Sequence, residues 1–250
     1  MNTFSKIITV LAMLFAVACY LFCNQEKPMP NIKTPRGAEL TTYLDIPEGN
    51  GRFPAVVVAP GLGYNATLPL FAKFADKCIE NEIICLRFEW DFYKQNTQPS
   101  QDLSHEYEDF ASAVDYLGKV PEVDTSKVFL SGKSLGAVIT SLYANKNHGF
   151  SGLVLFTPPI NTPEPPYELR ERAGEIGDIT APIAIIYGES DPICKTERLN
   201  ELVESFDNRP EMHRFGGDHS FKGATDAETD KNLENATDAA VEFILKTLGR

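Results

Sequence analysis

The chain has 250 residues, of which 43% are hydrophobic and 23% charged, and this suits one globular domain with a sizeable core. Its 23 Lys and Arg stand against 35 Asp and Glu, which gives a formal net charge of −12 at pH 7. A field of that sign repels phosphate groups, so the composition excludes a general nucleic-acid binder.

The first segment of the chain is apolar. After Lys6, an apolar run extends from Ile7 to Cys23, which is typical of an export signal or a membrane anchor. The small residues 16–18 form a cleavage pattern before Cys19, which could accept a lipid in a bacterial envelope. We predict that residues 1–25 are a signal peptide or N-terminal membrane anchor, and that the protein is exported or envelope-associated, either periplasmic or membrane-anchored. A buried N-terminal helix is the alternative.

Three cysteines lie beyond that run: Cys78, Cys85 and Cys194. Their number is odd and no Cys-x-x-Cys spacing repeats, so neither a disulfide framework nor a zinc site is indicated. Cys78 and Cys85 are interpreted as core thiols beside apolar neighbours, while a bridge between them stays open.

The remaining chain divides into a Pro-rich linker, residues 26–39, and one domain, residues 40–250. The alternation in 40–46 predicts a half-exposed, antiparallel-like strand. Continuous apolar runs, typical of strands covered on both faces, follow at 53–59, 83–88, 128–130, 153–156 and 183–187. Helical periodicity separates them, as in 110–117 and 236–244. The alternation predicts a three-layer α/β fold with a mostly parallel central sheet and helices on both faces.

One strand runs directly into Gly132-Lys133-Ser134-Leu135-Gly136, and a helical pattern follows at once. In that context Gly-x-Ser-x-Gly predicts a tight turn that raises the hydroxyl of Ser134 above the sheet, at a helix N-terminus whose amides favour negative charge. Only small residues fit two positions away, hence Gly132 and Gly136. A phosphate-binding loop would need glycine where Lys127 stands, so that alternative fails on spacing. We predict Ser134 as a nucleophile.

A serine nucleophile needs a base. Of the four histidines, His105 and His148 are expected to face solvent, and His213 lies in a predicted last strand. His219 differs because it lies in the Gly-rich loop 216–220, between that strand and the final helix. His219 is the predicted base.

The orienting acid is predicted to be Asp191, on the loop that leaves the strand 183–187 at the edge where open α/β sheets place their ligands. Glu189 and Asp218 are alternatives. The fourth part, an oxyanion hole, is predicted from the glycine-rich turn after strand 53–59. The N–H groups of Leu62 and Leu135 are the expected donors, and the predicted substrate-binding residues are Gly61, Gly63 and Lys133.

These stretches, namely 61–63, 132–136, 188–191 and 217–219, together resemble the α/β-hydrolase superfamily over roughly 40–248. Cys85-Leu-Arg-Phe88 together with the Ser134 turn is similar to a compact family related to dienelactone hydrolases, which includes a subunit of the nonspecific lethal chromatin complex. The resemblance implies an α/β-hydrolase fold and an acyl-enzyme. Dienelactone hydrolases use Cys where this chain has Ser134, which favours ordinary ester chemistry, and Pro60 stands where relatives often carry His.

A short, Pro-stiffened segment at 157–166, continuing to 177, is where this fold inserts its lid, and it predicts a shallow cleft for a small acyl group. Trp90, Phe92 and Tyr93 either form another wall or pack under a loop. Arg87, in a buried-looking strand, is expected to pair with a carboxylate.

The sequence thus predicts a serine hydrolase of small carboxylic esters or related acyl compounds that needs no metal and no organic cofactor. Its expected partner is a small-molecule acyl substrate, with no nucleic acid and with membrane association through the N-terminus, and its oligomeric state is left open. The alternatives are a non-catalytic interaction module of the same fold and an acyltransferase.

Overall fold

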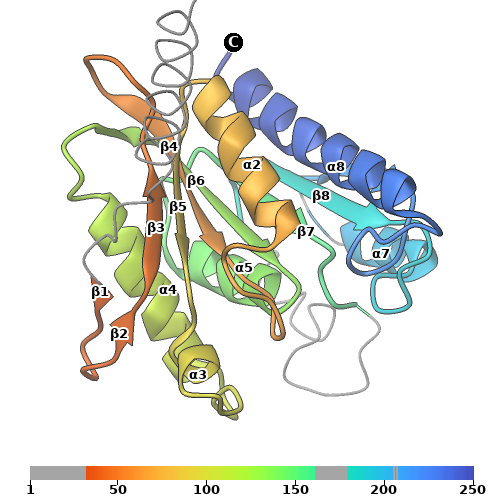
Figure 1. Ribbon diagram of the computed structural model, residues 1–250, viewed down its shortest axis with the longest axis horizontal. Helices are drawn as coiled ribbons and strands as arrows, with labels where there is room; N and C mark the ends of the chain where they lie inside the picture. The colour runs from red at the N-terminus through yellow and green to blue at the C-terminus, as the bar shows by residue number, and fades with distance from the viewer. Residues whose placement is uncertain (1–31, 161–178, 205, 207) are drawn as a thin grey trace, which may run out of the picture.

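The computed structural model describes residues 32–160, 179–204, 206 and 208–250, and its main feature is a seven-stranded sheet (Figure 1). The strands are β3 (Thr42–Asp45), β4 (Phe53–Ala59), β5 (Ile84–Phe88), β6 (Val123–Lys133), β7 (Gly152–Phe156), β8 (Ile183–Gly188) and β9 (Glu211–Phe215). Their order is β3-β5-β4-β6-β7-β8-β9. β3 is antiparallel to β5 and the other neighbours are parallel, which confirms the predicted α/β fold class.

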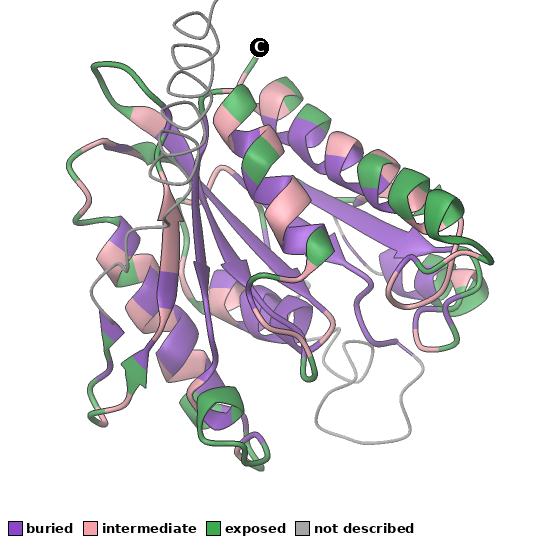
Figure 2. Ribbon diagram, viewed as in Figure 1, coloured by how far each residue is buried: buried purple, intermediate pink, exposed green. Residues whose placement is uncertain are grey.

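Helices cover both faces of this sheet (Figure 1). They are α2 (Pro69–Glu80), α3 (Asp91–Lys94), α4 (Ser104–Leu117), α5 (Leu135–Lys146), α7 (Thr196–Val203) and α8 (Asp226–Thr247). Because successive strand residues point to opposite faces, β4 divides its side chains between two cores. Val56 and Val58 pack with α2 and α8, whereas Ala55 and Val57 pack with α4 and α5. The central strands are therefore buried on both sides (Figure 2).

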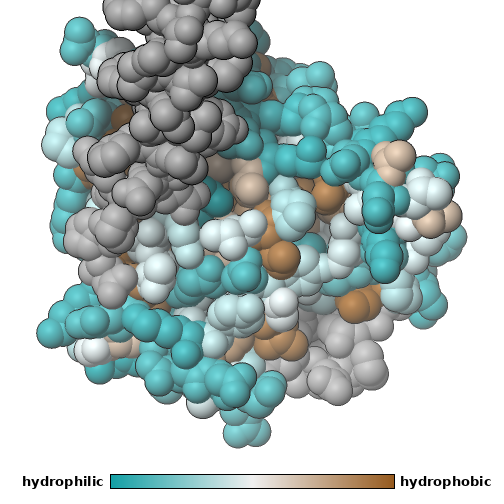
Figure 3. Space-filling model, viewed as in Figure 1, coloured by the Kyte–Doolittle hydropathy of each residue, from teal (hydrophilic) through white to brown (hydrophobic). Residues whose placement is uncertain are grey.

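The outer surfaces of α2 and α8 are hydrophilic in the face shown in Figure 3. The two helices are joined by Lys77, whose ammonium lies 2.6 Å from Glu234 and also pairs with Asp238. α8 begins with a capping box, in which Thr225 and Glu228 each accept the backbone N–H of the other. Charge pairs and caps fix the register of the long final helix that follows the His219 loop.

The segment predicted as a linker, 26–39, is structured in its described part. β1 (Ile32–Lys33) and β2 (Glu39–Leu40) form a separate antiparallel hairpin. Arg36 in its turn pairs with Asp109, which is 1% exposed, and lies 3.0 Å from Glu108. These ion pairs hold the hairpin against α4. The linker prediction is therefore corrected for this part of the chain, because an arginine in the turn pairs with a buried carboxylate.

Two further predictions concern segments that the structure does not describe. The proposed signal or anchor, 1–25, and most of the proposed lid, 161–177, lie outside the described residues. Among the helices that the structure does describe, none is long and apolar enough to span a bilayer. Cys78, Cys85 and Cys194 are free and buried, and burial raises the pKa of the Cys78 and Cys194 thiols.

Candidate active site

Ser134 occupies the single position between the end of β6 and the start of α5. Its φ of 53° and ψ of −118° lie in a region that side-chain-bearing residues rarely adopt. The turn is held from below because the Ser134 N–H donates to the carbonyl of Phe156, at the end of β7 (3.0 Å). The residue remains partly exposed. The strand-to-helix turn predicted from the sequence is therefore present, with the serine at its strained apex.

Both glycines of the motif are required by close backbone approach. A Cβ on Gly132 would lie 2.3 Å from the backbone of Gly136. A Cβ on Gly136 would lie 2.2 Å from the carbonyl oxygen of Ala59, at the end of β4. Real Cβ atoms do not approach so closely, so the motif's spacing reflects packing between β6, α5 and β4.

Asp191 and His219 are in direct contact. Oδ2 of Asp191 lies 2.8 Å from Nδ1 of His219, and Oδ1 accepts the backbone N–H groups of Ile193 (2.8 Å) and Cys194 (3.1 Å). The Asp191 side chain is fully buried and the imidazole is 17% exposed. Because two amides hold the Asp191 carboxylate in place, this carboxylate orients the imidazole through Nδ1 and leaves Nε2 without a partner on the Asp191 side, where it can exchange a proton.

The alternative acids have other partners. Asp218 accepts the amides of Ser220 (2.8 Å) and Lys222 (3.0 Å), so its carboxylate shapes the histidine loop. Glu189 is exposed. The loop is brought to the end of β8 by glycine, since a Cβ on Gly188 would lie 2.4 Å from the Asp218 carbonyl.

The other histidines lie where the sequence placed them. His105 and His148 are exposed, and His213 lies within β9. Because β6, β8 and β9 run parallel, their carboxyl ends share one edge of the sheet, and this edge carries Ser134, Asp191 and His219.

The turn after β4 packs against the serine. A Cβ on Gly61 would lie 3.4 Å from the Cβ of Ser134 and 3.2 Å from the ring of Tyr64. Leu62 is 45% exposed beside them. Within the described part of the chain, the N–H groups of Leu62 and Leu135 donate to no other protein group.

Beneath this turn lies a brace of hydrogen bonds that was not predicted from the sequence. The indole of Trp90 donates to the carbonyl of Pro60 (2.8 Å), and Glu89 accepts the N–H of Ala66 (2.8 Å). Arg87 donates to the Ala66 carbonyl (3.0 Å) and pairs with Asp45 at 2.8 Å. Burial raises the pKa of Glu89. The carboxylate partner expected for Arg87 is present, namely Asp45. Trp90 packs under the loop and does not form a wall of the cleft, so the second of the two interpretations holds for it. Hydrophobic patterning cannot reveal such a brace because it depends on where a distant loop lies.

Lys133 differs most from its predicted role. Its side chain is 1% exposed, its Nζ lies 4.0 Å from the centre of the Tyr64 ring, and it has no hydrogen-bond partner among the described residues. Burial lowers the pKa of Lys133 to about 7, with Asp191 and Asp218 acting in the opposite direction. The amine is thus enclosed by the turn rather than open to a substrate, in contrast to the prediction.

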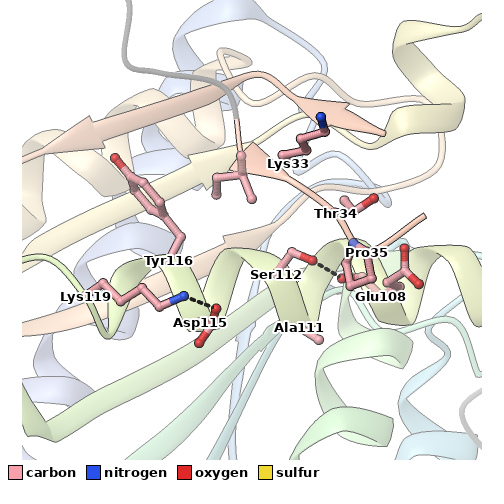
Figure 4. A pocket seen from close by; sticks show the side chains of 10 residues that line it. Lys33, Thr34, Pro35, Glu108, Ala111, Ser112, Asp115, Tyr116 and Lys119 are labelled. Carbon is pink, nitrogen blue, oxygen red and sulfur yellow. Dashed lines mark hydrogen bonds and ion pairs between the residues drawn. The ribbon is translucent and has the colours of Figure 1, made fainter. Parts of the chain in front are cut away.

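A pocket of about 650 Å³ lies elsewhere, between β1 and α4 (Figure 4). Thr34, Glu108, Ser112 and Tyr116 are among the side chains that line it, and no predicted catalytic or oxyanion-hole residue does. Across the described ranges, no cluster of three or more His, Cys, Asp or Glu side chains is placed to hold a metal ion.

Residues 53–245 match the family model of the alpha/beta hydrolase domain. The esterase EstD of Thermotoga maritima is 31% identical over 123 residues, which are 46% of this chain and 29% of that protein. The quorum-quenching protein AidA of Acinetobacter baumannii is 29% identical over 99 residues, 38% of this chain and 32% of that protein. The chain spans about a third of the length of these curated relatives.

Solved structures are similar over most of the chain. Est1E from Butyrivibrio proteoclasticus, solved with ferulic acid bound, has a TM-score of 0.71 at 17% identity and covers 89% of this chain and 100% of its own. Dienelactone hydrolase from Anabaena variabilis has the same score and identity, covering 89% and 97%. XC6422 from Xanthomonas campestris, described as a serine hydrolase without lid, scores 0.67 at 16% identity, covering 89% and 94%. The family model and the shared sheet architecture show that this chain belongs to the α/β-hydrolase family.

Proposed function

We propose that the protein is a serine hydrolase that cleaves small carboxylic esters through an acyl-enzyme. The observation that carries the proposal is the hydrogen bond between Asp191 and His219 at the sheet edge that also bears the strained Ser134. The names of an esterase relative and of esterase and serine hydrolase structures support the same reaction class.

In the proposed reaction, the Ser134 Oγ attacks the ester carbonyl carbon while its proton passes to Nε2 of His219. The resulting oxyanion is bound by the N–H groups of Leu62 and Leu135. The C–O bond then breaks, the leaving alcohol takes the proton from His219, and the acyl group remains on Ser134. Water, deprotonated by the same imidazole, attacks the acyl carbonyl carbon; the bond to the Ser134 Oγ breaks, Oγ takes the proton back from His219, and the acid leaves.

Asp191 has two roles in this scheme. Its carboxylate holds the proton of the imidazole on Nδ1, which leaves Nε2 free to accept the serine proton, and it stabilises the imidazolium that forms. The two amides of Ile193 and Cys194 keep that carboxylate fixed, so no reorganisation is needed when charge develops.

The experiment is hydrolysis of nitrophenyl acetate, butyrate and octanoate by the wild type, Ser134→Ala and a matched control, Ser112→Ala. Ser112 only donates to the Glu108 carbonyl within α4, so its loss should not change the rate. We expect Ser134→Ala to lower kcat/KM by about 10⁴-fold or more, with acetate and butyrate preferred. Equal activity in the two alanine variants would refute the proposal, and a folded wild type without activity would favour a non-catalytic module.

We also propose that the protein is exported or bound to the envelope membrane, on the strength of the apolar run 7–23. The mass of the mature N-terminus tests this. Lipid on Cys19, cleavage near it or an intact anchor in a membrane fraction would each support export, and an intact chain in the cytosolic fraction would contradict it.

A further inference from the structure

Lys133 is a buried amine that the proposed reaction does not use. It is the last residue of β6 and the neighbour of the nucleophile, and it is 1% exposed. A fully buried ammonium is costly unless it is paired, yet within the described residues its Nζ makes no hydrogen bond. A buried amine without a hydrogen-bond partner, placed beside the candidate nucleophile, calls for a functional explanation.

The contact that it does make is with the turn above it. Its Nζ lies 4.0 Å from the centre of the Tyr64 ring, well within the range of a cation–π interaction. Tyr64 closes the turn that begins at Gly61, since the Tyr64 N–H donates to the Gly61 carbonyl (3.4 Å). A Cβ on Gly61 would meet the Tyr64 ring at 3.2 Å and the Lys133 carbonyl at 3.4 Å. The Tyr64 ring therefore contacts the Lys133 ammonium and lies close to Gly61, while Gly61 in turn lies close to the backbone of Lys133 and to Ser134.

These contacts reach the turn that carries Leu62. The brace from Trp90 reaches the turn at Pro60, before Gly61, whereas the Lys133 contact reaches it at Tyr64, after Leu62. The oxyanion donor thus lies between two anchors. Donors of this kind act mainly in the transition state, so their position affects kcat more than KM.

We propose that Lys133 is a positioning residue, whose ammonium seated on Tyr64 holds the Gly61–Tyr64 turn against the nucleophile elbow. The inference rests on the proposed hydrolase function. It assigns to Lys133 no contact with substrate.

The charge on Lys133 is set by the groups around it: the Tyr64 ring from the turn, Asp191 from the loop after β8 and Asp218 from the loop after β9. Burial lowers the pKa of Lys133 to about 7, so the ammonium is lost just above neutral pH. A neutral amine makes no cation–π contact, and the hold on the turn should weaken there. Burial raises the pKa of Tyr64 to about 12, so the phenol keeps its proton throughout this range.

The test measures kcat and KM for nitrophenyl acetate between pH 6 and 9 in the wild type, Lys133→Met, Tyr64→Leu, the double variant and Tyr64→Phe. Methionine retains length without charge, leucine removes the ring, and phenylalanine keeps the ring. We expect Lys133→Met and Tyr64→Leu each to lower kcat about 10- to 30-fold at pH 6.5 with KM changed less than threefold. The double variant should be no worse than either single variant, and Tyr64→Phe should stay within about threefold of wild type.

In the wild type, kcat should fall several-fold from pH 7 to 9, whereas Lys133→Met should lack this decline. A Lys133→Met variant with wild-type kcat and pH profile would overturn the inference. It would also be overturned if the loss of kcat in the double variant equalled the product of the losses in the two single variants. Tyr64→Leu removes the same contact by changing its partly exposed partner. The contact can therefore still be tested if Lys133→Met fails to fold. A wild type that shows no Ser134-dependent activity overturns the proposed function and this inference together, whereas normal activity in Lys133→Met overturns the inference alone.

Discussion

Asp191 contacts His219 with one carboxylate oxygen, at 2.8 Å from Nδ1, while two backbone amides occupy the other. In Asp191→Asn the amide oxygen must stay with the backbone N–H groups of Ile193 and Cys194, because those donors need an acceptor. The side-chain NH₂ then faces Nδ1 and forces the imidazole proton onto Nε2. That tautomer cannot accept a proton from Ser134.

We therefore expect Asp191→Asn to fold normally and to lower kcat about 10³- to 10⁴-fold. Ester hydrolysis by the purified variant measures this. The control is Asp124→Asn, a partly exposed aspartate whose Oδ1 likewise accepts a nearby amide, that of Ser126 (3.1 Å), and which should retain full activity. A loss below tenfold in Asp191→Asn would show that this contact does not orient the base.

The second prediction concerns the elbow glycine nearest β4. In Gly136→Ala the new Cβ would lie 2.2 Å from the Ala59 carbonyl and 2.7 Å from that of Pro60, and backbone cannot yield as a side chain does. We expect a loss of unfolding free energy of more than about 3 kcal/mol, seen in urea titration or as insoluble protein. In Gly118→Ala the nearest atom is 3.7 Å away, so that control should change stability by less than about 0.5 kcal/mol. Equal stability of the two variants would contradict the packing argument.

The third prediction concerns the hairpin anchor. Arg36 binds the buried carboxylate of Asp109, whose pKa is raised to about 6 by burial even though Arg36 opposes the shift. Arg36→Met removes that opposition, so the pKa of Asp109 should rise further. A carboxyl with a raised pKa favours folding below its unfolded pKa, and this advantage is lost as pH rises through the folded value.

Arg36→Met should therefore destabilise the protein by about 3 kcal/mol at pH 8 and by less at pH 5. Urea unfolding at both pH values measures the difference. Arg198→Met breaks an exposed pair with Glu201 (3.0 Å) and should cost no more than about 0.5 kcal/mol at either pH. A loss in Arg36→Met that does not depend on pH would show that Asp109 is not the group involved.

The fourth prediction is that Lys133 lowers stability in a pH-dependent way. An unfolded lysine holds its proton up to about pH 10.4, whereas folding lowers the pKa of Lys133 to about 7. Between these values the unfolded chain binds more protons, so the unfolding free energy rises with pH across that window. Lys133→Met removes the titrating group.

At pH 6.5 we expect Lys133→Met to be more stable than the wild type by on the order of 2–5 kcal/mol, with the gap narrowing by pH 9.5. Urea unfolding at the two pH values is the measurement. Lys119→Met, at an exposed position whose side chain is 72% exposed, should show a small difference that is the same at both. A gap that widens with pH would have the wrong sign for a buried amine. Together with the expected loss of kcat, this outcome would make Lys133 a residue kept for function at a cost in stability.

Local patterns account for what the sequence predicted well. The Ser134 turn depends on residues two positions apart, and continuous apolar runs identify strands that are buried on both faces. The contact between Asp191 and His219 was predicted because parallel strands deliver their following loops to one edge. The choice between Asp191, Glu189 and Asp218 needed the structure, which shows two backbone amides engaging Asp218 and the imidazole engaging Asp191.

What the sequence could not predict depends on contacts between distant segments. Because Lys133 is adjacent to Ser134, the sequence made it a candidate for substrate binding. In the structure its side chain instead points at the ring of Tyr64, which lies nearly seventy residues earlier in the chain. The same holds for Trp90, whose indole finds Pro60, and for Arg36, whose partner Asp109 lies on α4. A turn rich in Pro and charge looks like a linker until its partner is known.

The most direct test of Ser134 as the nucleophile is to treat the folded protein with a fluorophosphonate and map the adduct by mass spectrometry of peptides. We expect one adduct on Ser134, no labelling in Ser134→Ala, and much slower labelling in His219→Gln, because the hydroxyl then lacks its base. An adduct on another serine, or labelling that persists in Ser134→Ala, would contradict it.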